Sequence, residues 1–226
     1  MPGPLLAPFD LIAGHVVTRI RDRRALLDTG SSVTFGRCDG MRLLGDEHRI
    51  SPSILGFTVD TAVERIRQLP GVAPDFDFDL LLGTDLLWGH RLVLDFTSRL
   101  LRIDLAPGFA THVPGSVRQR FIIEDLLIWG APVTAVVDTG APVSYLSAAQ
   151  ASGFPLTGRV RDFFHGEGDF EVALRRGRAV FRGREVVVDF AEPPSSVSMA
   201  MRLLGVEAIV GTDLLEQLGV VVLEVC

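Results

Sequence analysis

One segment of the chain occurs twice, and this repeat limits the possible folds more than any other feature. The residues Ala-Leu-Leu-Asp-Thr-Gly-Ser-Ser-Val-Thr-Phe at 25–35 return as Ala-Val-Val-Asp-Thr-Gly-Ala-Pro-Val-Ser-Tyr at 135–145. A second motif follows each copy, Leu-Leu-Gly-Thr-Asp-Leu-Leu at 81–87 and Ile-Val-Gly-Thr-Asp-Leu-Leu at 209–215. Because internal repeats correspond to repeated structural units, the sequence predicts two similar halves.

The segment before each Asp-Thr-Gly triplet consists of two β-type runs around a turn, which is typical of a β-hairpin. These hairpins are predicted at 16–27 and 121–137. Further β-type runs lie at 91–96, 100–105, 184–190 and 220–225. Helical spacing is found only in short stretches, at 59–66, at 198–204 and in turns opening at Leu86 and Leu214. The predicted fold class is all-β with a few short helices.

A stretch rich in Pro and Gly, at 106–115, shows no periodicity and separates the two halves. We therefore expect an N-terminal lobe at 1–105, which contains Asp28, and a C-terminal lobe at 116–226, which contains Asp138. A linker of about ten residues is too short to keep two domains far apart. The lobes are expected to pack against each other.

The two Asp residues of the triplets each follow a run of apolar residues, where an isolated carboxylate is costly. If a pseudo-twofold axis relates the halves, equivalent loops near that axis meet, and Asp28 and Asp138 face each other. Such a pair shares one proton, because two adjacent negative charges repel. One carboxylate can then take a proton from water while its partner hydrogen-bonds a carbonyl oxygen. This chemistry requires no metal, cofactor or covalent intermediate.

The segments Leu27-Asp-Thr-Gly-Ser31 and Val137-Asp-Thr-Gly-Ala141, each followed by an apolar-apolar-Gly motif, resemble the pepsin and retropepsin superfamily. The segment at 209–219 resembles the retroviral version of the second motif. The resemblance implies a two-lobed acid-protease fold and an aspartic endopeptidase whose catalytic residues are Asp28 and Asp138. It also implies that Thr29 and Thr139 interlock across the axis, and that Gly83 and Gly211 lie on strands beneath the active loops.

The remaining residues of the two loops have supporting roles in this interpretation. Gly30 and Gly140 permit the tight turn after each Asp. Ser31 in the first half corresponds to Ala141 in the second, and only a hydroxyl can donate a hydrogen bond to a carboxylate. We therefore expect Asp28 to be the more readily ionised partner, and the activity optimum to be less acidic than that of a secreted digestive enzyme.

A hairpin that could cover the site is predicted in the second half, from strands at 160–164 and 170–174 around a turn at 165–169. The first half leaves little room for one between 35 and 58. This single flap lies in the opposite lobe from that of pepsins. The flap residues expected to contact substrate are His165, Gly166, Glu167 and Gly168. The histidines His15, His48, His90 and His112 are expected to be solvent-facing or structural.

The family resemblance implies a peptide or protein substrate, and the composition argues against nucleic-acid and membrane partners. The net charge is −6 and the basic residues are scattered, which argues against a nucleic-acid partner. No apolar run is long enough for a membrane helix. The only cysteines, Cys38 and Cys226, suggest neither a disulfide framework nor a zinc site, so a reduced cytoplasm is the expected location. A monomer is expected, because both triplets belong to one chain.

Two other functions remain open from the sequence. A peptidase-like scaffold without turnover could bind peptides or a partner protein, and it would bind a statine-type inhibitor without cleaving peptides. An actin-like ATPase also uses duplicated Asp-x-Gly turns, but that fold requires long helices and a longer chain.

Overall fold

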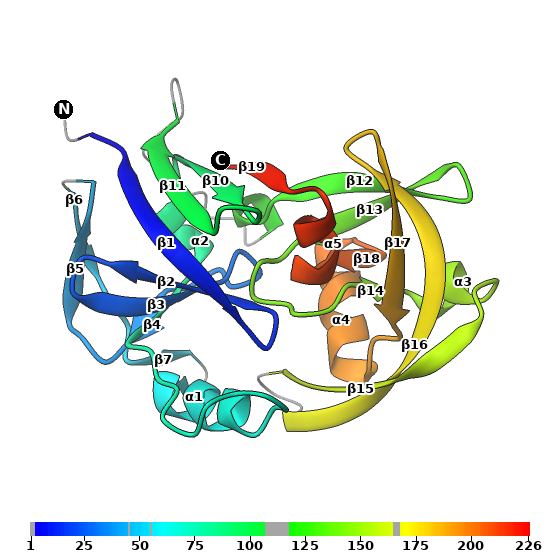
Figure 1. The fold of residues 1–226 in the computed structure, drawn as a ribbon, viewed down its shortest axis with the longest axis horizontal. Coiled ribbons are helices and arrows are strands. Elements are labelled where there is room, and N and C mark those ends of the chain that lie inside the picture. The colour runs from blue at the N-terminus through cyan, green and yellow to red at the C-terminus, as the bar shows by residue number, and fades with distance from the viewer. Residues whose placement is uncertain (1–2, 45, 55, 107–117, 165–167) are drawn as a thin grey trace.

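The computed structural model describes residues 3–44, 46–54, 56–106, 118–164 and 168–226. Two curled β-sheets form the body of the fold, one built mainly from each half, and the helices are short (Figure 1). The predicted all-β, two-lobed fold is confirmed. The proposed linker lies almost entirely in 107–117, outside the described residues, so the lobe boundary at 106–115 stays a prediction.

The first sheet has eight strands, in the order β19-β10-β11-β1-β2-β3-β9-β4. Its strands are β1 (Leu5–Ile12), β2 (His15–Ile20), β3 (Arg23–Leu27), β4 (Phe35–Gly36), β9 (Leu80–Leu82), β10 (His90–Asp95), β11 (Leu100–Leu105) and β19 (Val220–Val225). The predicted hairpin before the first triplet is β2–β3, in which Val17 pairs with Leu26.

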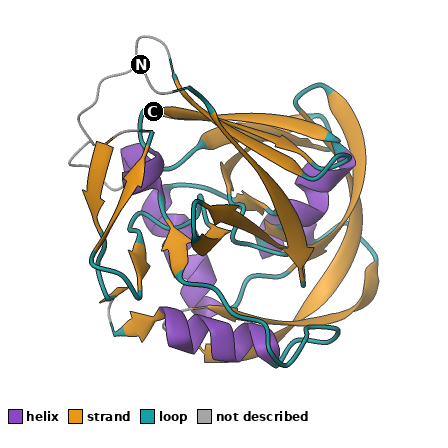
Figure 2. Ribbon diagram, turned by 60° about the vertical axis from the view of Figure 1, so that its left-hand side comes forward, coloured by secondary structure: helices purple, strands orange, loops and turns teal. Residues whose placement is uncertain are grey.

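The second sheet has seven strands, in the order β12-β13-β18-β14-β17-β16-β15. They are β12 (Ile123–Ile128), β13 (Ala131–Val137), β14 (Tyr145–Leu146), β15 (Leu156–Phe164), β16 (Gly168–Phe181), β17 (Arg184–Ala191) and β18 (Ala208–Val210). The predicted hairpin before the second triplet is β12–β13. Strands β15, β16 and β17 form a long meander that curves around this half (Figures 1 and 2).

Short hairpins and helices complete the fold. The hairpins are β5 (Gly40–Leu43) with β6 (Asp46–Arg49), and β7 (Ser53–Ile54) with β8 (Phe57–Thr58). The helices are α1 (Val59–Arg67), α2 (Thr84–Leu87), α3 (Ala148–Ala151), α4 (Ser195–Leu204), α5 (Thr212–Gln217) and the 3-10 turn η1 (Arg118–Arg120). The predicted helical stretches correspond to α1 and α4, and the turns at Leu86 and Leu214 to α2 and α5.

The sequence repeat corresponds to a repeat in topology. Strand β3 pairs in parallel with β9, which pairs in antiparallel with β4. In the second half β13 pairs in parallel with β18, which pairs in antiparallel with β14. The two strands that lead into the triplets end in buried residues, 25–27 and 135–137. Each Asp therefore stands at the end of a buried central strand.

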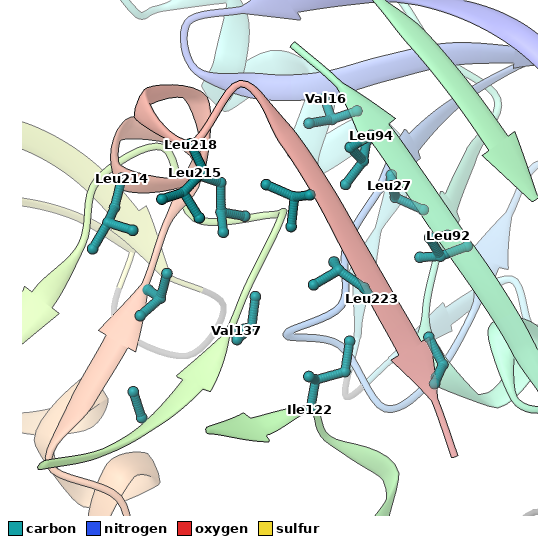
Figure 3. Packing of buried hydrophobic residues seen from close by; sticks show 14 of the residues in the cluster. Val16, Leu27, Leu92, Leu94, Ile122, Val137, Leu214, Leu215, Leu218 and Leu223 are labelled. Carbon is teal, nitrogen blue, oxygen red and sulfur yellow. The ribbon is translucent and has the colours of Figure 1, made fainter. Parts of the chain in front are cut away.

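The halves are joined by a shared sheet and a shared core. The last strand, β19, pairs with β10 of the first half over the full length of both strands. Figure 3 shows Leu223 of β19 near Leu92 and Leu94 on one side and Ile122 and Val137 on the other. These side chains belong to one hydrophobic cluster with residues from both halves. Burial of this apolar surface, at about 25 cal/mol per Å², fixes the halves against each other.

The described helices are too short for an actin-like ATPase fold. In the described part of the chain, the longest helix is α4, with 10 residues. None of the described helices has the length and apolar character needed to cross a membrane. The long helices of an actin-like ATPase are not found there, and the sheets do not alternate with helices as that reading requires.

Candidate active site

Asp28 and Asp138 lie next to each other, each on the loop that follows its central strand. The backbone N–H of Gly30 donates to Oδ1 of Asp28 at 3.0 Å and to Oδ1 of Asp138 at 3.1 Å. The N–H of Gly140 donates to Oδ1 of Asp138 at 2.8 Å. Since one amide reaches both carboxyl groups, the structure brings the two predicted residues into a single half-buried pair.

The glycine of each triplet lies against the carboxyl group of the other half. A Cβ atom at Gly30 would lie 2.1 Å from Oδ2 of Asp138, and one at Gly140 would lie 2.4 Å from Cγ of Asp28. Any other residue would overlap these atoms. The sequence predicts a turn role for both glycines, and the structure adds that they allow the close approach of the two loops.

The threonines of the triplets interlock through four hydrogen bonds between the halves. Thr29 Oγ1 donates to the carbonyl of Val137 at 2.8 Å and accepts from the N–H of Thr139 at 3.0 Å. Thr139 Oγ1 donates to the carbonyl of Leu27 at 2.9 Å and accepts from the N–H of Thr29 at 3.1 Å. Both side chains are fully buried. The expected interlock is present, and it fixes the two loops relative to each other.

The Asp of each Gly-Thr-Asp motif forms hydrogen bonds with the loop that follows the Asp-Thr-Gly triplet of the same half. Asp85 Oδ1 accepts from the N–H and the hydroxyl of Thr34, at 2.8 and 2.7 Å. Asp213 Oδ1 accepts from the hydroxyl of Ser144 at 2.6 Å. The sequence predicts only that helical turns open directly after these Asp residues, at Leu86 and Leu214. The hydroxyl residue found six positions after both triplet Asp residues was the signal for this second role.

The glycines of that motif pass directly under the loops, as the family resemblance implies. A Cβ atom at Gly83 would lie 2.5 Å from the carbonyl carbon of Val33. One at Gly211 would lie 2.6 Å from the carbonyl oxygen of Val143. Each loop thus rests on the backbone of its own half, at a distance that only glycine allows.

Ser31 does not act as the sequence predicts. Its hydroxyl donates to the carbonyl of Val33 at 2.8 Å, two residues further along the same loop, and not to the carboxylate of Asp28. The N–H of Val33 also donates to this hydroxyl, at 3.4 Å, so both of these hydrogen bonds stay within the turn. Ala141 occupies the equivalent position and lines the same cavity as the pair. The difference between Ser31 and Ala141 therefore does not set which Asp ionises first.

The electrostatics of the pair favour Asp138 as the charged partner, opposite to the expectation. Burial, the negative charge of Asp138 and the hydrogen bond to it raise the pKa of Asp28 well above its usual value. Burial also raises the pKa of Asp138, but hydrogen bonds from Gly140, Asp28 and Gly30 oppose that shift. Asp138 accepts two backbone N–H groups where Asp28 accepts one, so its carboxylate form is better stabilised.

Three further polar residues line the cavity beside the pair, and sequence reasoning did not assign them to the site: His15, Tyr145 and Asp162. The hydroxyl of Tyr145 donates to Asp162 Oδ2, and both side chains are buried. Burial raises the pKa of Asp162 to about 6. Asp162 lies in the predicted flap strand, but nothing in the local pattern distinguishes it from a surface residue.

His15 is buried, and of the two roles expected for it the structural one applies. Its Nδ1 lies 2.9 Å from the carbonyl of Gly140, which can only accept, so Nδ1 carries the proton. Burial lowers the pKa of His15 to about 4. A neutral ring therefore supports the second loop from the first half. His90 is also buried, with Nδ1 2.9 Å from the carbonyl of Trp88.

The hairpin predicted over the site is β15–β16, with Val160 opposite Val172 and Asp162 opposite Phe170. Phe163 and Phe170 line the cavity beside the pair. The tip residues His165, Gly166 and Glu167 lie outside the described residues, and Gly168 begins β16. In the first half, the short hairpin β7–β8 reaches the same cavity through Phe57. The longer hairpin belongs to the second half, as its sequence indicates.

A second cavity also reaches Asp138. Its lining consists of first-half residues, including Ser32 and Ile54, and mostly apolar second-half residues, including Met201 of α4. The cavity beside Asp28 is lined by Ala62 and Ile66 of α1, the helix in the corresponding place of the first half. Val197 of α4 lines this first cavity as well, so the two cavities adjoin at Asp138. Nowhere in the described ranges do three His, Cys, Asp or Glu residues converge as a metal ion would require.

Neither a protein family nor a curated protein matches this sequence. Among solved structures, the chain is similar to an EIAV protease complexed with the inhibitor HBY-793. The two are 21% identical, with a TM-score of 0.35, and the match covers 49% of this chain and 95% of the protease chain. At this level of similarity the function has to be argued from the site itself.

Proposed function

We propose that the protein is an aspartic endopeptidase in which Asp28 and Asp138 together activate a water molecule against a peptide bond. The observation that supports this most strongly is the Gly30 amide, which donates to both carboxyl groups. Two half-buried acids held this close share a proton, which gives one acid and one base at the same point. The interlocked threonines and the opposed glycines maintain that geometry.

The roles of the two acids follow from their surroundings. Asp138 is the better stabilised anion and removes a proton from the water as its oxygen attacks the carbonyl carbon. Asp28 carries the shared proton and donates it to the carbonyl oxygen. When the tetrahedral carbon collapses, the C–N bond breaks and Asp138 gives its proton to the leaving amine. One hydroxyl of the former carbonyl carbon returns its proton to Asp28, so the pair recovers its starting state.

The substrate in this proposal is an extended peptide that lies between the β15–β16 hairpin and the pair. Strand β15 stands at the edge of its sheet, where a peptide can add main-chain hydrogen bonds. The apolar pocket beside α4 accepts an apolar side chain next to the scissile bond. The residues 165–168 remain the predicted flap contacts. One chain supplies both acids, so a monomer suffices, and we retain the cytoplasm as its proposed location.

Cleavage of a diverse peptide library by Asp28→Asn and Asp138→Asn protein tests the proposal. Each variant removes one member of the acid–base pair, so we expect a loss of about 100-fold or more in kcat/KM. The control is Asp22→Asn, which changes an Asp with a side chain 80% exposed. Undiminished cleavage in either variant would contradict the mechanism. Binding of a statine-type inhibitor by a wild-type protein that cleaves nothing at any pH would instead identify a peptide-binding scaffold.

A further inference from the structure

The β15–β16 hairpin of the second half extends onto the first half. In Figure 1 the ends of β15 and β16 lie beside α1. Phe163, on β15, packs against a hydrophobic cluster made of first-half residues, which includes Val63 and Ile66 of α1. Phe163 and Ile66 also line the cavity beside the pair. The hairpin therefore covers that cavity by resting on the opposite half.

An ion pair fixes the hairpin at this contact. Arg65 of α1 donates from Nη1 to Oδ1 of Asp169 on β16, at 2.5 Å. Arg161 of β15 holds the second oxygen of Asp169 at 3.0 Å. The side chains of Arg65 and Asp169 are 29% and 33% exposed, so water screens this pair less than one that is fully open. The acid thus bridges its own hairpin and the opposite half.

One register pair further from the tip, at Asp162 and Phe170, the hairpin is anchored to its own half. Tyr145 lies on β14, just beyond the loop of Asp138, and its hydroxyl donates to Asp162 on β15. This contact stays within the second half and is buried. The hairpin is therefore tied firmly to its own half at one point. At the next register pair toward the tip, the ion pair of Asp169 with Arg65 and the packing of Phe163 connect it to the other half.

We propose that Asp169 and Arg65 form a latch that holds this hairpin closed over the substrate, and that they act as positioning residues for the cleavage reaction. A peptide enters only when the latch opens, and is retained while it is closed. The kinetic part of this inference rests on the proposed peptidase function. The closure itself does not, because it can be measured on a protein without substrate.

The ion pair between Asp169 and Arg65 should persist at acidic pH. Burial acts to raise the pKa of Asp169, but the hydrogen bonds and charges of Arg65 and Arg161 outweigh it and lower the pKa below its usual value. Asp28, in contrast, has a raised pKa. The latch therefore stays charged at pH values at which the half-buried pair keeps its shared proton.

Amide hydrogen exchange in the hairpin strands, 156–164 and 168–181, tests the latch directly. Arg65→Gln removes the ion pair and keeps a good helix former, so exchange of these amides should become about two- to fivefold faster. Arg65→Lys keeps the charge and should restore most of the protection. The control is Arg178→Gln, which removes an exposed ion pair with Glu185 within the second half. Equal exchange in Arg65→Gln and Arg178→Gln would overturn the latch.

Steady-state kinetics of peptide cleavage test the role of the latch separately from the proposed peptidase function. If the latch retains substrate, Arg65→Gln should raise KM by a similar factor of about two to five and leave kcat nearly unchanged. Faster exchange with an unchanged KM would overturn the kinetic role. If exchange increases in Arg65→Gln but the wild type cleaves no peptide, the latch is supported and the peptidase proposal fails. If the wild type cleaves peptides and exchange does not change, the latch is wrong.

Discussion

Gly30 and Gly140 occupy positions at which any side chain would meet the carboxyl group of the opposite half. The Asp-Thr-Gly triplets predict the identity of the acids because the residue types are repeated in matched surroundings. They do not predict where the Ser31 hydroxyl points, since that depends on the turn geometry and on the nearby Val33 carbonyl. The same limit applies to Asp162, which meets Tyr145 only through the tertiary fold.

The variant Gly140→Ala tests the importance of this close approach. Its new Cβ would lie 2.4 Å from Asp28 Cγ, so the pair must separate. Since acid–base catalysis depends on hydrogen-bond distances, we expect a loss of about 100-fold in kcat/KM. Gly158→Ala, which adds a Cβ with no atom within 4 Å, serves as the control. Wild-type kinetics in Gly140→Ala would show that the two carboxyl groups need not be this close.

The site lies on two short loops, each of which follows a central strand. The threonine hydrogen bonds that interlock these loops require both halves of the chain. Local patterns predict the hairpins β2–β3 and β12–β13 well, because turn residues and alternating polarity mark them. They do not indicate that β19 pairs with β10, since pairing partners far apart in the chain leave no local signal. The strands β5 to β8 are missed because runs of two to four residues show no clear period.

Removal of one hydroxyl should weaken the connection between the halves. Thr139→Val leaves the carbonyl of Leu27 and the N–H of Thr29 without their buried partner. Since each unsatisfied buried group costs about 1–3 kcal/mol, the free energy of unfolding should fall by about 3 kcal/mol. Thr157→Val, at an exposed position on β15, should have little effect. Urea unfolding of the two variants measures this difference, and equal stabilities would rule out a structural role for the interlock.

Two acids outside the catalytic pair, Asp162 and Asp213, make the stability of the whole molecule depend on pH. Burial raises the pKa of Asp162 and of Asp213 to about 6, although both accept hydrogen bonds. The folded state therefore prefers their protonated forms. Their contribution to stability is fully present below the unfolded pKa of about 3.9 and is lost as pH rises through about 6. Each shift corresponds to a free energy on the order of 3 kcal/mol.

Asp213→Asn, which resembles the protonated acid, should remove one part of this pH dependence. Relative to wild type, its free energy of unfolding should increase by on the order of 3 kcal/mol between about pH 4 and about pH 7.5. Its carbonyl oxygen can still accept from Ser144, so the fold is retained. Chemical denaturation at the two pH values measures this, with Asp22→Asn as an exposed control. A constant difference between Asp213→Asn and wild type would mean that Asp213 ionises normally.

The central claim is that Asp28 and Asp138 act as one unit, and a double-mutant comparison of peptide cleavage tests it most directly. Rates are measured for wild type, Asp28→Asn, Asp138→Asn and the double variant on one library-selected peptide. Because each acid is useless without the other, we predict that both single variants lose nearly all activity and that the double variant is no slower than either. Losses that multiply in the double variant would show two independent groups and contradict the shared pair.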